Sequence, residues 1–409
     1  MSFPTSAYST FEGHPLKYEN LQTLLEKQNC NVRKAPKSGQ KSRKFKRIVI
    51  CCDGTWQKSD GPDKAPPSNV TRMARSIKSY AKRDKIQQIV YYQRGVGTSG
   101  KIDKILGGGT GVGLDDNIRV AYGFIAHNYH KRDEIFLIGF SRGAYTVRSV
   151  CGLISTIGVL TKKGMNDFAD IWKTYTSKEG FTPEIGFHDV ELSDTIENAF
   201  HALALDENRG PFTPTLWKRQ SGSKTNLKQV WFPGVHSNIG GGYEDQEIAD
   251  ITLGWMIQNL SPFLEFSKSN LIELLQNVVY DEVGRANPHL QWAGGKIEDS
   301  SNTILMWLMS GVHRTPGGYL HHQDIKKGIR TEESMHRSVS IRYAMDPSWR
   351  PKGLEGWTYD EEQGLWENKA ENKELLEDHL GEVEKQLAGQ WVLENMCGEE
   401  WSGKWLGRW

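Results

Sequence analysis

The sequence of 409 residues lacks any apolar run of the roughly 20 residues that a membrane-spanning helix needs. Its mean hydropathy of −0.58 and its hydrophobic fraction of 37% also argue against an integral membrane protein. The sequence lacks a charge excess as well, since 51 Lys and Arg stand against 50 Asp and Glu, for a formal net charge of +1. Proteins that recognise nucleic acids usually carry a clear basic excess, so we expect no nucleic acid partner.

Cysteine is scarce and forms no motif. The five cysteines have irregular spacing and include no Cys-x-x-Cys pair: Cys30, Cys51, Cys52, Cys151 and Cys397. This pattern argues against a zinc site or a disulfide framework. The N-terminal residues do not show the basic stretch followed by an apolar stretch that marks a secretory signal. We therefore expect a cytoplasmic protein.

Both ends of the chain differ in composition from its centre. Residues 1–44 are predicted to form a basic, flexible leader, since 31–47 is polar and rich in Lys and Arg. Such a patch can also contact a membrane surface. Residues 351–409 are rich in Trp, Glu and Lys, and within them 372–391 has the pattern of a charged amphipathic helix. The sequence thus predicts one α/β domain over 45–350 that is followed by a C-terminal extension.

Short β-branched runs alternate with helical patterns in this domain. Strands are predicted at 47–52, 86–92, 134–140 and 228–235, and helices at 68–81, 115–129, 141–160 and 248–259. This alternation is typical of β-α-β units, a mostly parallel sheet and helices on both faces. The Gly-rich run at 107–113 (GGGTGVG) lacks the Lys-Ser/Thr pair of a P-loop, so a close-packed loop is favoured over a nucleotide site.

The strongest chemical signal is Gly139-Phe140-Ser141-Arg142-Gly143. A G-x-S-x-G stretch between a strand and a helix of small residues is the setting of a nucleophile elbow, in which a sharp turn exposes the serine hydroxyl. The two glycines leave room for that turn. The backbone N–H of Arg142, at the start of the helix, would then donate to a developing oxyanion. The alternative is an ordinary strand-to-helix turn with an incidental serine.

A serine nucleophile needs a base to take its proton, and two histidines are candidates. His236 directly follows a predicted strand, opens a Gly-rich turn at 240–242 and precedes a helix. The second candidate, His336, stands just before another apolar stretch. A structural histidine that bonds the turn backbone is the alternative interpretation of His236.

The acid of a Ser-His-acid triad is marked less clearly. Asp206 is the best placed aspartate between Ser141 and His236, although a helix-end or ion-paired aspartate fits the same pattern. Neither Asp206 nor any of the other candidates follows a convincing strand; the others are Asp167, Asp170, Asp189 and Asp194. Asp53 and Gly54 follow the first predicted strand, at the sheet edge where ligands bind in α/β folds. They are expected to line the site or complete the oxyanion hole, unless Asp53 only caps its turn.

Six blocks of the sequence resemble the α/β-hydrolase domain of type VI secretion phospholipase effector-like proteins, and the intracellular fungal members are especially similar. The blocks are RIVICCDGTW, SNVTRMARSI, YYQRGVGT, GFSRGAYTVRSVCGLI, HALALDENRGPFTPTLW and VWFPGVHSNIGGGY. The resemblance covers about residues 45–345. It implies an α/β-hydrolase fold and a serine esterase that acts on acyl esters, with phospholipids as the substrate class. It implies no metal or organic cofactor, and it is compatible with peripheral contact to a membrane.

Two departures from the family pattern bear on the site. The family block with His-Ser-Asp has Asn238 in its third position, and an amide cannot carry the negative charge of a carboxylate. The family also has a strand that ends in an aspartate before the HALALDE block, whereas this chain passes from 174–180 directly to 181–186. We therefore expect a sheet that lacks one strand and a triad in which Asp206 substitutes for the acid. The alternative is a catalytically inactive interaction module with a hydrolase fold.

Overall fold

The computed structural model of the chain describes residues 45–54, 66–95, 113–177, 191–267, 269–270, 293–299 and 310–387. The predicted leader, residues 107–112 of the Gly-rich run, and the stretch 178–186 next to the expected strand loss lie outside the described residues. Among the helices of the described residues, none has the length and apolar character that a bilayer-spanning segment requires.

The first sheet is built around strand β1 (Lys46–Cys52), a β-branched run that is buried along almost its whole length. It pairs in parallel with β3 (Ile86–Gln93) on one side and with β4 (Glu134–Gly139) on the other. The short β2 (Tyr80–Ala81) pairs antiparallel with β3, so the strand order is β2-β3-β1-β4. β1, β3 and β4 fall where the sequence predicts strands. The helix predicted over 68–81 ends at Ser76, and Tyr80–Ala81 pairs with β3 as a strand instead.

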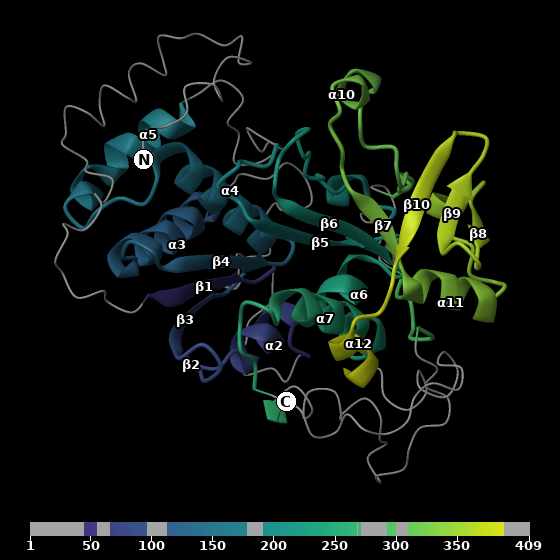
Figure 1. Cartoon of the computed structure of the whole chain (residues 1–409), viewed down its shortest axis with the longest axis horizontal. Coiled ribbons are helices and arrows are strands. Elements are labelled where there is room, and N and C mark those ends of the chain that lie inside the picture. Colours follow the sequence, from purple (N-terminus) through teal and green to yellow (C-terminus); the bar gives the residue numbers. More distant parts are fainter. Residues whose placement is uncertain are drawn as a thin grey trace.

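Helices cover both faces of this sheet, because side chains of β1 point alternately to its two sides. Ile48, Ile50 and Cys52 share a core with one group of helices, α3 (Leu114–Asn128), α4 (Arg142–Ile157) and α5 (Phe168–Thr176). Val49 and Cys51 face the other group, α2 (Asn69–Ser76) and α7 (Glu247–Leu260). Figure 1 shows the two groups on opposite sides of the strands. The expectation of an α/β fold with a mostly parallel sheet is confirmed.

The second sheet has six strands in the order β5-β6-β7-β10-β9-β8. β5 (Asn198–Ala204), β6 (Asn226–Phe232), β7 (Glu333–His336) and β10 (Lys373–Asp378) are parallel neighbours. β9 (Leu365–Asn368) and β8 (Thr358–Asp360) add antiparallel strands at the far edge. The connections of this sheet contain α6 (His236–Gly240), α10 (His322–Lys326), α11 (Arg337–Met345) and short 3-10 turns at Gly210–Phe212 and Lys352–Leu354. A further 3-10 turn, Gly164–Asp167, links α4 to α5.

The prediction of a helix over 372–391 is wrong for its first part. Residues Lys373–Asp378 form strand β10, and only Glu382–Leu387 is helical (α12) within the described residues. Leu375 and Glu377 are buried while the side chains between them are not, which is the period of a strand. Pairing with β7 and β9 therefore overrides the helical propensity of this Glu- and Lys-rich sequence.

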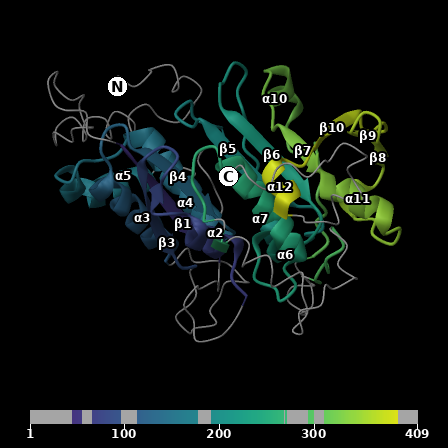
Figure 2. The ribbon, with the colours of Figure 1, turned by 60° about the horizontal axis from the view of Figure 1, so that its bottom comes forward.

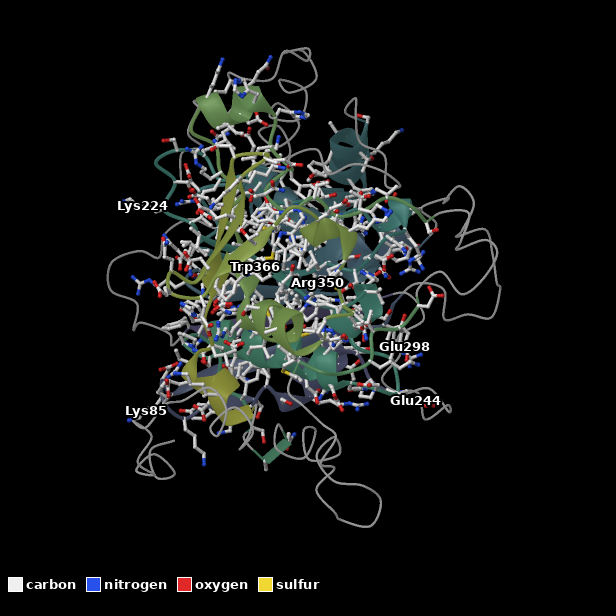
Figure 3. All side chains as sticks on the ribbon, turned by 90° about the vertical axis from the view of Figure 1, so that its right-hand side faces the viewer. Lys85, Lys224, Glu244, Glu298, Arg350 and Trp366 are labelled. Atoms are coloured by element: carbon white, nitrogen blue, oxygen red, sulfur yellow. The ribbon has the colours of Figure 1, made fainter. Side chains whose placement is uncertain are left out.

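Two tryptophans after residue 350, Trp357 and Trp366, pack against the second sheet. Trp357 and Trp366 are buried in one core together with Trp231 of β6. Figure 3 labels Trp366 among the side chains of this part of the molecule. Residues 351–378 thus complete the sheet that begins with β5 and β6.

No strand of the described residues lies between the two sheets, since β4 pairs only with β1 and β5 only with β6. Helix α7 packs against both of them. Its Leu253 and Ile257 belong to the core of the first sheet, and its Ile248 and Trp255 to that of the second. The views in Figures 1 and 2 show the strands as two neighbouring groups with α7 beside both.

The start of α4 lies directly on the backbone at the end of β1. A Cβ atom added to Gly143 would lie 2.1 Å from the carbonyl oxygen of Cys52 and 2.5 Å from that of Asp53. Since backbone atoms cannot yield as a flexible side chain does, only glycine allows this approach.

We expect Gly143→Ala to lower the free energy of unfolding by about 3 kcal/mol, at the upper end for overpacking, because the clash is with backbone. Chemical denaturation measures the change. Gly123→Ala is the matched control, because the nearest atom to its added Cβ lies 3.8 Å away and the position is inside helix α3. That substitution should be stabilising by about 0.5–1 kcal/mol. Equal stabilities for the two variants would contradict the close approach.

We expect Trp366→Ala to cost about 3–5 kcal/mol of unfolding free energy, because it empties a fully buried site in the second sheet. Leu376→Ala, in the same three-stranded region but 66% exposed, should change stability by less than about 0.5 kcal/mol. Urea denaturation of both variants tests whether residues after 350 belong to the core. A small effect at Trp366 would show that they do not.

Candidate active site

Ser141 occupies the sharp turn between β4 and α4. Its backbone has φ 55° and ψ −125°, in the region with positive φ that few residues other than glycine adopt. The turn requires small neighbours, because a Cβ on Gly139 would lie 2.6 Å from the carbonyl oxygen of Gly143. Backbone strain of this kind persists only where the surrounding structure enforces it, and it is frequent at active sites. The structure thus has a sharp strand-to-helix turn at Ser141, where the sequence predicts one.

His236 opens α6 after the end of β6 and lies next to this turn. Its ring stacks on Phe140, the residue before the serine, with centroids 4.7 Å apart and planes at 30°. Phe212 packs edge-on against the imidazole at 4.9 Å and 71°. The imidazole Nε2 is buried and has no hydrogen-bond partner among the described residues. The structure thus places the His236 ring against the residue that directly precedes Ser141.

The environment of His236 keeps its imidazole neutral. Burial lowers the pKa of His236 to about 4, and the positive charges of Arg209 and Arg314 act in the same direction, whereas Glu207 raises it. At neutral pH the ring therefore retains a lone pair that can accept a proton.

Asp206 follows strand β5, which the sequence analysis did not predict, and no hydrogen bond joins it to His236 within the described part of the chain. Its carboxylate accepts from the backbone N–H of Gly234 at 2.6 Å and from the indole N–H of Trp349 at 2.8 Å. Burial raises the pKa of Asp206. Since Gly234 lies two residues before His236, Asp206 fixes the loop that carries the histidine.

Glu207, which the sequence analysis did not single out, is the carboxylate bonded to His236. It accepts from the backbone N–H of His236 at 3.1 Å and from the guanidinium of Arg209 at 2.8 Å. Although burial raises the pKa of Glu207, the bonds to Arg209 bring it down to about 2. The Arg209 guanidinium in turn lies 3.7 Å from the centre of the Phe212 ring. One chain of contacts thus runs from Glu207 through Arg209 and Phe212 to the imidazole.

Asp53 directly follows β1, in the loop that borders the Ser141 turn. One oxygen of this 2% exposed carboxylate accepts from the hydroxyls of Ser68, Thr71 and Tyr92 at 2.7–2.8 Å. The other accepts from the backbone N–H of Gly54 at 2.8 Å. A Cβ on Gly54 would lie 3.1 Å from the Cβ of Ser141, so this loop borders the serine. The N–H of Gly54 already serves Asp53, which leaves Arg142, the first residue of α4, as the predicted oxyanion donor.

The departure at Asn238 has a local cause. Its side-chain oxygen accepts from the backbone N–H groups of Val235 and Glu298, and its N–H donates to the carbonyl of Lys296 at 3.0 Å. A carboxylate has no donor for the last of these bonds. The asparagine therefore ties the His236 loop to residues 296–298.

The second histidine considered from the sequence, His336, is fully buried. Its Nε2 lies 2.9 Å from the carboxylate of Glu384 and its Nδ1 2.8 Å from the hydroxyl of Ser338. It also stacks on Phe232. A substrate cannot reach it in this arrangement. No group of three or more His, Cys, Asp or Glu side chains in the described ranges could hold a metal ion.

The sequence matches a family profile described as the catalytic domain of the Tle1-like phospholipase effectors of the type VI secretion system. The match comes in two stretches, 46–186 and 178–259, which meet where the sequence predicts the loss of a strand. Over 149 residues the chain is 30% identical to the uncharacterized protein YEL023C of Saccharomyces cerevisiae. That alignment covers 33% of this chain and 21% of the yeast protein.

Two solved structures have weak overall similarity to this chain. A crystal structure of an uncharacterized protein from Pseudomonas aeruginosa has 16% identity and a TM-score of 0.32, over 60% of this chain and 48% of that one. The Tle1 effector bound to the VgrG spike of the type VI secretion system has 18% identity and a TM-score of 0.25, over 53% and 56%. This chain spans about half of each solved structure and about a fifth of the yeast protein. The two profile matches together cover 46–259, which is more than half of the sequence, and the chain belongs to the family of Tle1-like phospholipase effector catalytic domains.

Proposed function

We propose that this protein is a serine hydrolase that cleaves acyl esters of lipids, phospholipids foremost, through an acyl-serine intermediate. The observation that carries the proposal is the juxtaposition of the strained Ser141 turn and the unpartnered Nε2 of His236 across Phe140. A serine hydroxyl is a weak nucleophile until a neighbouring base takes its proton. Membership of a phospholipase family supports lipid esters as the substrate class.

In the proposed reaction the Ser141 oxygen attacks the acyl carbonyl carbon while its proton passes to Nε2 of His236. The backbone N–H of Arg142 donates to the oxyanion of the tetrahedral intermediate. The imidazolium then gives its proton to the leaving alcohol oxygen as the ester C–O bond breaks. Water attacks the acyl-serine in the same way, its proton passing through His236, and the fatty acid leaves as Ser141 regains its hydrogen.

In this proposal two carboxylates, those of Glu207 and Asp206, together take the role of the triad acid. Glu207 provides a fixed negative charge that favours the imidazolium formed during the reaction, and it bonds the backbone of His236. Asp206 holds the loop through Gly234. The ring orientation of the imidazole comes from its packing between Phe140 and Phe212. The expected substitution of Asp206 for the family acid is thus proposed as a positioning role.

We expect Ser141→Ala to abolish p-nitrophenyl acyl ester hydrolysis, with a loss of at least about 10³-fold, because no other group takes over the nucleophile. A fluorophosphonate probe should label the wild-type protein at Ser141 and leave the variant unlabelled. Ser149→Ala, in the same helix α4, is a control for the effect of removing a hydroxyl. Absence of both labelling and turnover in the wild type would support the inactive interaction module instead.

We expect the acid limb of the kcat/KM profile to lie near pH 4, well below the ordinary histidine pKa of 6.5. The reason is that His236 of the free enzyme becomes protonated only when the pH falls to about 4. Activity should therefore persist as pH falls through 6.5 and disappear as it falls through about 4. Phe212→Leu opens the ring to water, so the limb should move toward 6.5. A wild-type limb at 6.5 or above would contradict the buried, neutral base.

A further inference from the structure

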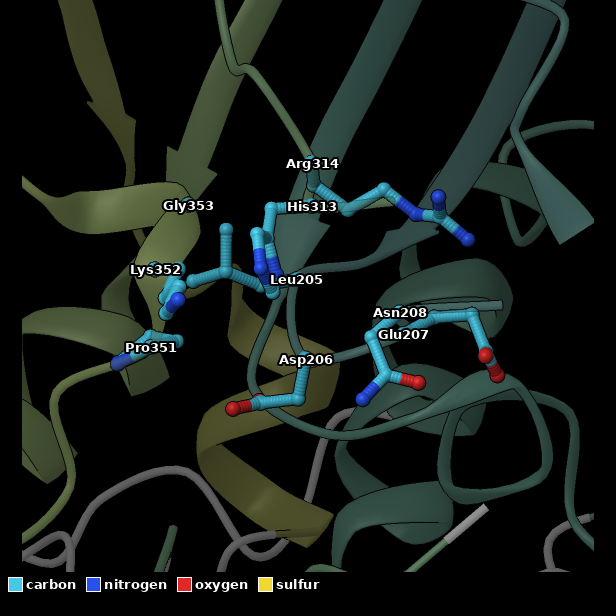
Figure 4. A pocket seen from close by; sticks show the side chains of 9 residues that line it. All are labelled: Leu205, Asp206, Glu207, Asn208, His313, Arg314, Pro351, Lys352 and Gly353. Atoms are coloured by element: carbon cyan, nitrogen blue, oxygen red, sulfur yellow. The ribbon is translucent and has the colours of Figure 1, made fainter. Parts of the chain in front are cut away.

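A buried cation, the guanidinium of Arg314, lies close to the proposed catalytic residues. Arg314 belongs to the loop before α10 and is only 3% exposed. Figure 4 shows its side chain directed toward the side on which the Glu207 carboxylate lies. In the described part of the chain the guanidinium donates to backbone carbonyl oxygens, that of Phe212 at 2.8 Å and those of Arg209 and Val312 at 3.4 Å. Burial of a cation costs free energy that no bonded carboxylate offsets here, which points to the contacted segment as the reason for its position.

Two of these contacts join Arg314 to one short turn. The same terminal nitrogen, Nη2, donates to the carbonyl of Phe212 and to that of Arg209. The two carbonyls belong to the last residue and to the N-cap of the 3-10 turn Gly210–Phe212. A single 3-10 turn has poor hydrogen-bond geometry of its own, so a bond at each end fixes it to the neighbouring loop.

The turn carries the two side chains that shape the surroundings of His236. The Phe212 ring packs edge-on against the imidazole, with centroids 4.9 Å apart. The Arg209 guanidinium lies 3.7 Å from the centre of that ring and bonds Glu207, which accepts from the backbone N–H of His236. Both side chains thus come from residues whose carbonyls Arg314 binds, so a shift of the turn would displace them together.

We propose that Arg314 is a positioning residue for the proposed base, because its hydrogen bonds to the turn hold Phe212 against the His236 ring and Arg209 beside Glu207. These bonds clamp the turn, and Arg314 acts through the side chains that the turn carries. Without the clamp, Phe212 moves off the ring, water reaches the imidazole, and the imidazole loses an orienting contact. As a device that serves the histidine, the clamp rests on the proposed function.

Arg314→Lys separates the hydrogen bonds from the charge. A lysine ammonium nitrogen stands one bond short of the terminal guanidinium nitrogens, so it keeps the positive charge and loses the bond to the Phe212 carbonyl. The charges that act on the imidazole are then unchanged: Glu207 raises the pKa of His236, and Arg209 and the cation at position 314 lower it. We expect kcat for ester hydrolysis to fall about 10–100-fold with an unchanged KM, because misplaced groups around a catalytic base cost this much.

The titration of His236 can be followed by NMR on the full chain without substrate, its signals being assigned by their loss in His236→Gln. Because burial lowers the pKa of His236 to about 4, the wild-type imidazole should stay neutral down to about pH 5. In Arg314→Lys, hydration of the ring should raise this pKa toward 6.5. Phe212→Leu should raise it with Arg314 intact, and adding Arg314→Lys to Phe212→Leu should change it little further, since both act through one turn.

Arg47→Lys is the matched control for replacing a buried arginine. Arg47 bonds Asp84 and Glu134 near the start of β1, at the opposite end of that strand from Asp53. This substitution should leave kcat and the titration of His236 unchanged.

Each outcome decides for or against the clamp. A folded Arg314→Lys variant whose kcat and His236 titration equal those of the wild type would overturn it and leave Arg314 with its charge alone. Equal losses in the Arg314 and Arg47 variants would overturn it too. If Arg314→Lys does not fold, Phe212→Leu decides: a His236 pKa that stays at about 4 contradicts the clamp, and a raised pKa supports it. A shifted titration in Arg314→Lys, with a wild type that hydrolyses no ester, would support the clamp and overturn the proposed function alone.

Discussion

The burial of α7 in two cores is the constraint on which the rest of the arrangement depends. Ser141 follows β4 of the first sheet and His236 follows β6 of the second, and no hydrogen bonds between strands of the described residues join the sheets. Leu253 and Ile257 hold α7 to one sheet, and Ile248 and Trp255 hold it to the other. Apolar packing of α7, and not a continuous strand ladder of the described residues, thus holds the proposed nucleophile and the proposed base in place.

The contact between Phe140 and His236 connects the Ser141 turn to the loop that carries the histidine. Phe140 is fixed by the turn of the serine, and a Cβ on Gly240 of α6 would lie only 2.0 Å from its ring. The His236 imidazole packs between the rings of Phe140 and Phe212. The Arg209 guanidinium lies over the Phe212 ring. In a Ser-His-Asp triad one aspartate both orients the imidazole and stabilises its positive charge. In the mechanism proposed here, ring packing orients the imidazole and Glu207 supplies the negative charge.

Local sequence patterns were sufficient for strands β1, β3, β4 and β6 and for the serine turn. The β-branched runs, the glycines at 139 and 143 and the position of His236 after a strand are all signals within a few residues. β10 was missed because its strand state comes from pairing with β9 and with β7, of which β7 lies about 40 residues earlier. Glu207 was missed because the direction of adjacent side chains after β5 depends on where the β6 loop and Trp349 lie. Such contacts between distant segments leave no periodic pattern in the sequence.

The strand order of the second sheet also bears on how the chain is made. Synthesis proceeds from the N-terminus, and multi-element proteins form structure as segments emerge. All strands of the first sheet have left the ribosome once residue 139 has done so, whereas β7 keeps an open edge until Lys373–Asp378 is released. The half that carries His236 is therefore the last to close. A nascent chain can thus form the Ser141 turn before the sheet that precedes His236 is complete.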